Sequence, residues 1–103
     1  MINEEPRLGD KLYFCFMYED GEWEISYVEI IRVWTDTEAY VIPRKVCTGR
    51  VIKNTPKHAV GQKEIIDNFW HLQKSEEDCK KLLFMSLLKY GMKAFWKDVP
   101  PWQ

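Results

Sequence analysis

The sequence predicts an α+β domain in which a small, strongly bent antiparallel sheet is followed by a C-terminal amphipathic helix that packs on it. Two observations favour the sheet. Short runs of aromatic and β-branched residues alternate with turn signals through residues 11–72, and the period of two in the longest run breaks near Val28. A third observation predicts the helix, because Ser75 precedes three acidic residues and then apolar residues at helical spacing.

The first two strands are expected at residues 11–18 and 23–33. Residues 19–22 (Glu-Asp-Gly-Glu) form a turn signal between them, and residues 35–38 form a second turn. Because a bulge or a sharp bend would explain the break in alternation near Val28, we expect the second strand to bend there. A strand of this kind helps a small sheet to curl towards a barrel.

The middle of the chain predicts two shorter strands and a loop. A strand at residues 39–42 has to end, or to lie at an edge, at Pro43, because proline has no N–H for the ladder. A weaker strand is expected at about residues 46–53. Residues 54–63, which contain proline, glycine and polar residues, are predicted to form a loop.

The last strand is expected at residues 69–72, paired with residues 65–66. Several short strands followed by one terminal helix favour a particular architecture within the α+β class. We expect an SH3-like half-barrel with the helix packed across it.

The helix begins after Ser75, whose hydroxyl is an N-cap, and its acidic first turn matches the helix dipole. One apolar face is formed by Cys79, Leu82, Leu83, Leu87 and Tyr90. That face is widened, beyond what one small sheet usually covers, by Phe84, Leu88, Met92 and Phe95. Gly91 caps or kinks the helix, and residues 98–101 end it.

Length and composition indicate one domain. A chain of 103 residues with 46% hydrophobic content can bury a single core, and residues 1–8 and 98–103 are expected to be flexible tails. The N-terminus has no secretory signal pattern, and no apolar run approaches the length of a membrane span. Three widely spaced cysteines fit reduced thiols, so we expect a cytoplasmic protein.

Charge is distributed unevenly along the chain, although the net charge is only −1. Residues 1–38 hold ten acidic and three basic residues, whereas residues 39–63 hold six basic residues and no acidic one. The rest of the chain is balanced. The sequence therefore predicts that opposite charges lie on separate surfaces, where each is available to a partner.

Two binding functions follow from this distribution. The first is a non-enzymatic protein-binding module, in which exposed aromatic and acidic side chains contact a partner with a basic groove. Its candidate residues are Glu19, Asp20, Glu22, Glu24, Trp34 and Trp102. A homodimer formed through the C-terminal helix is a further expectation.

The alternative function is nucleic-acid binding, because lysine and arginine side chains neutralise phosphates and release counterions. Its candidate residues are Arg44, Lys45, Arg50, Lys53 and Lys57. A pI near 6.1 weighs against this alternative. The simpler interpretation is that these lysine and arginine side chains form ion pairs with acidic side chains on the first strands of the same molecule.

No catalytic motif indicates an enzyme, and we expect neither a cofactor nor a metal. Cys47, His58, His71 and Cys79 are the one possible metal-ligand set, but their spacing is wrong for compact zinc motifs. Cys47 is the single candidate nucleophile, because nearby basic residues would lower its thiol pKa if it were exposed. Cys15 and Cys79 are predicted to be small core residues.

The helix start Ser-Glu-Glu-Asp-Cys-Lys-Lys-Leu (residues 75–82), after a β-rich half opening with Gly-Asp-Lys-Leu-Tyr (residues 9–13), resembles small phage and prophage accessory proteins. In these proteins a capping Thr or Ser and two glutamates start the last helix. This chain differs from them, because Cys79 replaces the usual Ala and the Phe before the cap is missing. The resemblance implies an accessory protein of a mobile element that binds and inhibits a host defence protein.

Overall fold

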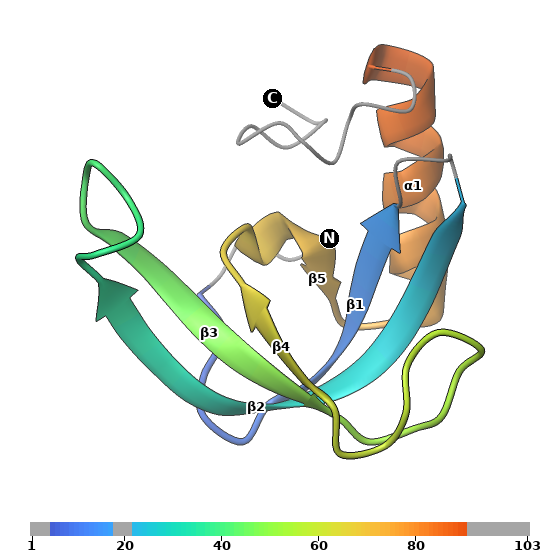
Figure 1. Ribbon diagram of the computed structural model, residues 1–103. Coiled ribbons are helices and arrows are strands. Elements are labelled where there is room, and N and C mark those ends of the chain that lie inside the picture. Colours follow the sequence, from blue (N-terminus) through green and yellow to red (C-terminus); the bar gives the residue numbers. More distant parts are fainter. Residues whose placement is uncertain (1–4, 18–21, 91–103) are drawn as a thin grey trace.

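The computed structural model describes residues 5–17 and 22–90, which form a five-stranded antiparallel sheet and one C-terminal helix (Figure 1). The α+β class is therefore confirmed. The strands and helices, in chain order, are β1 (Lys11–Met17), β2 (Trp23–Asp36), β3 (Arg44–Val51), β4 (Lys63–Ile66), the 3-10 turn η1 (Phe69–His71), β5 (Leu72–Gln73) and α1 (Glu76–Tyr90).

The sheet has the order β4-β3-β2-β1-β5, with every neighbouring pair antiparallel. β2 is the central strand, and its two halves have different partners. Residues 23–29 pair with β1, whereas residues 28–36 pair with β3. The register of β2 against β3 shifts between Ile30 and Arg32, so the predicted irregularity exists just beyond Val28. Figure 1 shows β2 and β3 curving together, and β4 and β5 remain the two edges of an open sheet.

The concave face of the sheet carries the larger core. Alternation directs every second side chain of β1 and β2 to this face. Its buried residues are Leu12, Phe14, Val28, Ile30, Cys47, Val51, Ile66 and Leu72. Gly49 lies at the centre of β3, where an added Cβ would come within 3.0 Å of Val28 Cγ2 and 3.2 Å of Ile66 Cδ1. The close approach of three strands at this point therefore favours a residue without a side chain, because a Cβ would displace Val28 and Ile66.

α1 packs on the opposite face of β1, against a second and smaller core. This core contains Cys15, Trp70, Cys79, Leu82 and Leu83. The predicted N-cap is confirmed, because the Ser75 hydroxyl accepts a hydrogen bond of 3.1 Å from the N–H of Asp78. The apolar face of the helix is also wider than the area that the sheet covers, as predicted, because Phe84 and Leu88 are exposed.

The structure differs from the sequence-based assignment in the middle of the chain. Residues 39–42 are not a strand, because Asp36 Oδ1 accepts the N–H groups of Glu38 and Ala39 and turns the chain. Residues 69–72 do not pair with residues 65–66. Residues 69–71 form η1, and Leu72 pairs with β1, while residues 65–66 belong to β4 and pair with β3.

In residues 5–17 and 22–90, no helix is long and apolar enough to cross a membrane. The predicted N-terminal tail is in part tied to the sheet. Pro6 is buried, and the carboxylate of Glu5 forms an ion pair with Lys45. The other predicted tail, residues 98–103, lies outside the described residues.

Candidate functional site

The basic segment does not form a separate surface, because several of its cations pair with the acidic front half. Lys45 Nζ lies 3.2 Å from Glu5, Arg50 Nη2 lies 2.9 Å from Glu29, and Lys57 Nζ lies 2.6 Å from Glu22. The prediction that opposite charges are sorted onto separate surfaces is therefore wrong. The antiparallel pairing of β2 with β3 places Arg50 directly opposite Glu29, and the other two pairs join Lys45 and Lys57 to residues that precede β1 and β2.

Arg44 is engaged at the other end of β3. Its Nη2 donates a 2.6 Å hydrogen bond to Asn68 Oδ1, and its guanidinium lies 5.4 Å from the ring centre of Tyr40. The Tyr40 hydroxyl donates to Asp67 at 2.8 Å. Burial and the Asp67 carboxylate together raise the pKa of Tyr40. Arg44 thus joins the β2–β3 connection to the segment after β4. Nucleic-acid binding stays a prediction, and fewer lysine and arginine side chains of the basic segment are left to contact phosphates than the sequence suggests.

Lys53 is exposed in the segment that follows β3. Trp34 is half-buried in β2, with the guanidinium of Arg32 4.3 Å from its ring centre. Glu19, Asp20 and Trp102 lie outside the described residues. Of the acidic candidates, Glu22 is exposed and holds Lys57.

Glu24 was expected on an exposed strand face, and this expectation is wrong, because the side chain is only 8% exposed. Its Oε1 accepts the backbone N–H of Lys57 at 3.2 Å, and its Oε2 lies 3.1 Å from His58 Nδ1. Burial acts to raise the pKa of Glu24. Hydrogen bonds from Thr55 and Lys57, together with the interactions with His58, outweigh burial and lower this pKa.

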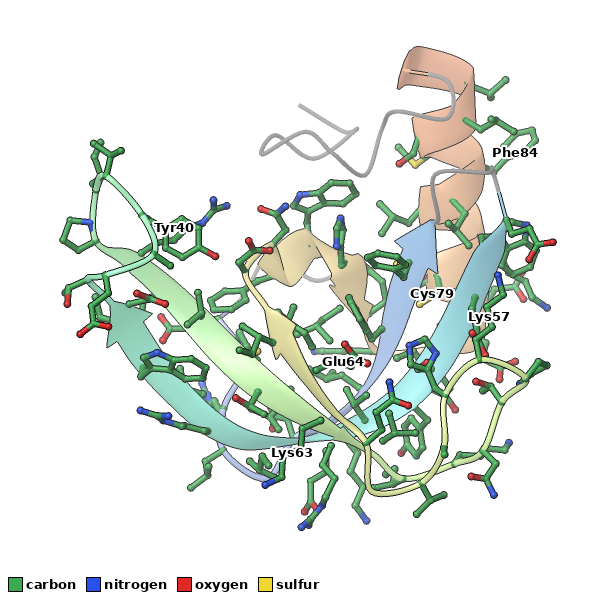
Figure 2. The ribbon with its side chains drawn as sticks, in the orientation of Figure 1. Tyr40, Lys57, Lys63, Glu64, Cys79 and Phe84 are labelled. Carbon is green, nitrogen blue, oxygen red and sulfur yellow. The ribbon has the colours of Figure 1, made fainter. Side chains whose placement is uncertain are left out.

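His58 lies between two carboxylates on different strands. Nδ1 faces Glu24 on β2, and Nε2 lies 3.6 Å from Oε1 of Glu64 on β4. Figure 2 shows Glu64 on β4 and Lys57 on the loop that precedes this strand. The imidazole therefore ties residues 52–62, which connect β3 to β4, to the rest of the sheet. The position of this tie fixes where Thr55, Pro56 and Lys57 lie.

Cys47 does not have the properties of a nucleophile. The side chain is fully buried on the concave face, and burial raises the pKa of its thiol to about 12. The basic residues near it in sequence do not lower that pKa, because Arg44 and Arg50 point to the opposite face of β3 and the ammonium group of Lys45 is exposed beside Glu5. The interpretation of Cys15 and Cys79 as core residues is confirmed.

His71 is also buried, and desolvation lowers the pKa of its imidazole to about 4. His71 and Cys79 do not form a metal site with Cys47 and His58. Within the described ranges, no three histidine, cysteine, aspartate or glutamate residues are arranged to hold a metal ion.

An exposed apolar hollow lies where the start of β2 meets the outer side of α1. It has a volume of about 180 Å³ and is lined by Trp23, Lys80, Leu83, Phe84 and Leu87. Trp23 is 52% exposed, Phe84 63% and Leu87 49%, while Leu83 is buried and forms the floor. Large side chains that stay this exposed beside one another are uncommon on a domain with no partner.

A wider cleft of about 430 Å³ adjoins the hollow and shares Trp23 and Lys80 with it. Its lining residues are Glu22, Trp23, Glu24, Ile25, Thr55, Pro56, Lys57, Glu76 and Lys80. We refer to the hollow and the cleft together as the Trp23 groove. Figure 2 places Phe84, which lines the hollow, and Lys57, which lines the cleft, on the same flank of the molecule.

The sequence contained one signal for this groove. Phe84 and Leu88 extend the apolar face of the helix beyond what the sheet covers, and both are exposed in the structure. Trp23 was missed, because the strand pattern does not reveal which face of the sheet the helix covers. Trp34, one of the two tryptophans selected from the sequence, is not among the described residues that line the groove, and Trp102 lies outside the described residues.

Comparison of this chain with models of protein families, with curated proteins and with solved structures finds no match.

Proposed function

We propose that this chain is a non-enzymatic protein-binding domain whose contact surface is the Trp23 groove. The observation that carries the proposal is the adjacency of three large exposed apolar side chains, Trp23, Phe84 and Leu87, around one hollow. Tryptophan in particular provides a large contact area and dominates the binding energy of many interfaces.

The rim of the groove supports the same proposal. Lys80 borders the apolar hollow, and Glu22, Lys57 and Glu76 line the adjoining cleft, so charged groups of both signs lie beside the apolar side chains. An apolar centre within a charged rim is the usual anatomy of a protein interface, where the centre supplies affinity and the rim supplies orientation. The predicted role of an acidic surface is thereby replaced by an apolar one, with Glu22 retained at its edge.

Two finer parts of the proposal concern architecture and origin. The bent β2, shared between two halves of the sheet, and the 3-10 turn before the short β5 support an SH3-like half-barrel. The resemblance to phage and prophage accessory proteins supports a host protein, in the host cytoplasm, as the partner. Inhibition of a host defence protein is the role that this resemblance suggests.

Affinity capture from a host lysate with matched variants tests the proposal. We compare the native chain with Phe84→Ser, which removes a groove side chain, and with Ile65→Ser, which removes an equally exposed side chain from β4. A protein bound through the groove is recovered by the native chain and by Ile65→Ser. Its recovery falls at least about tenfold with Phe84→Ser, as expected for the loss of a hot-spot side chain.

Two results would contradict the proposal. One is equal recovery of every protein by all three chains, which would remove the groove from binding. The other is recovery of nothing but further copies of this chain, which would replace a foreign partner with self-association. Thermal unfolding of both variants checks that they fold, since substitutions at exposed positions usually change stability by less than about 0.5 kcal/mol.

A further inference from the structure

The first half of β2 has one paired edge and one unpaired edge. Its residues 23–27 pair with β1, but the ladder with β3 begins only at Val28. Beyond Val51 the chain makes one more bond, from the N–H of Ile52 to the carbonyl of Tyr27, and then turns away. On the edge that faces away from β1, residues 23–25 therefore border the Trp23 groove with no described strand paired to them.

The alternation of an antiparallel strand shows which backbone groups face this gap. The N–H of Ile30 donates to Asp10, just before β1, so the even-numbered residues of β2 point their backbone groups towards β1. The odd-numbered residues point the other way, as the bond from Ile52 to Tyr27 requires. The N–H and carbonyl of Ile25 accordingly face the cleft.

These two groups of Ile25 form no hydrogen bond with any other residue of the described chain. If β3 extended further in the same register, Thr55 and Pro56 would lie opposite Glu24 and Trp23, but they line the cleft instead. The turn bond from Thr55 N–H to the His58 carbonyl shapes this segment, and the contacts of Lys57 and His58 anchor it to the side chain of Glu24, not to the backbone edge of β2. The gap is thus maintained by specific contacts.

We propose that the partner binds as an extended peptide that adds a strand to the free edge of β2 at Trp23–Ile25. One apolar side chain of the peptide fills the hollow formed by Trp23, Leu83 and Phe84. This inference rests on the proposed function and specifies how the partner is recognised. Main-chain hydrogen bonds to Ile25 supply affinity for any sequence, and the hollow selects the side chain.

A library of random linear peptides, selected on the full chain, provides the probe. The best peptide is labelled with fluorescein, and its affinity is measured by fluorescence polarisation against the native chain and Phe84→Ser. The peptide is then resynthesised with a single N-methyl group at each position in turn. Strand addition predicts that affinity falls on the order of tenfold or more at alternate positions and little at those between, because only every second amide faces β2.

Amide hydrogen exchange gives an independent measurement with an internal control. On binding of the peptide, exchange of the Ile25 amide slows strongly. The Ser26 amide, which already faces β1, changes little.

The outcomes separate this inference from the proposed function. A peptide that depends on Phe84 but shows no alternation on N-methylation, and leaves the exchange of Ile25 unchanged, overturns strand addition alone. Strand addition alone is also overturned if the selection yields no peptide while the recovery of a captured protein still falls with Phe84→Ser. Binding of peptide and protein that is indifferent to Phe84→Ser overturns the proposed function as well.

Discussion

The imidazole of His58 and the carboxylate of Glu24 are 3.1 Å apart, and each side chain is only 8% exposed. Neither residue belongs to the hydrophobic cores. The pair instead joins the connection between β3 and β4 to the first half of β2, the segment that borders the Trp23 groove. The shape of the candidate binding site therefore depends on a buried polar contact.

Removal of His58 is expected to destabilise the fold strongly. In His58→Ala the Glu24 carboxylate stays buried after losing its imidazole partner, so we expect the free energy of unfolding to fall by about 2–4 kcal/mol. Arg50→Ala is the matched control, because it breaks an exposed ion pair with Glu29, for which a loss of under about 1 kcal/mol is typical. Denaturant titration measures both values, and similar losses in the two variants would contradict the role assigned to His58.

Burial of His71 predicts a loss of stability in mild acid. Its pKa is about 4 in the folded chain against an ordinary value of 6.5, so between these values the unfolded chain binds the proton more readily. The contribution of His71 is fully present above pH 6.5 and is lost as the pH falls towards 4. His71→Phe, which preserves an aromatic ring beside Trp70 and Phe14, should therefore lose less stability over this interval. Thermal unfolding across the pH range measures the difference, and identical slopes would refute the explanation.

The thiol of Cys47 is expected to be unreactive in the folded chain. It is fully buried, and its pKa of about 12 leaves almost no thiolate at neutral pH. A thiol reagent such as dithionitrobenzoate should modify Cys47 in the native chain at a rate set by unfolding, and rapidly in denaturant. Peptide mapping after timed labelling assigns the modified cysteine. Rapid native labelling of Cys47 would show that the concave core opens more readily than its burial implies.

The elements that were predicted correctly are those determined by local sequence. The N-cap at Ser75 depends on a contact over three residues, and the bend in β2 leaves a break in alternation within the strand itself. The misassigned strand at residues 39–42 shows the limit of such patterns. Exposed Val41 and Ile42 imitate a strand, while the turn is directed by the carboxylate of Asp36.

The candidate site could be predicted only in part, because its contacts join distant positions. Lys57 and Glu22 are 35 residues apart in the chain, and no local pattern pairs them. The excess width of the helix face, at Phe84 and Leu88, was the available signal that an apolar surface stays exposed. The location of that surface beside Trp23 depends on which side of β1 the helix covers, and that choice is made by tertiary packing.

A strand edge with unbonded backbone groups also invites neighbouring molecules to stack on it, which is a common start of aggregation. Two residues that line the cleft next to Ile25 discourage such stacking. Pro56 has no N–H to offer a further strand, and Lys57, with its partner Glu22, places a charged pair in the path of any flat, uncharged β-segment. The loop that leaves this edge open thus also acts as its gatekeeper, admitting one short segment and resisting indefinite growth.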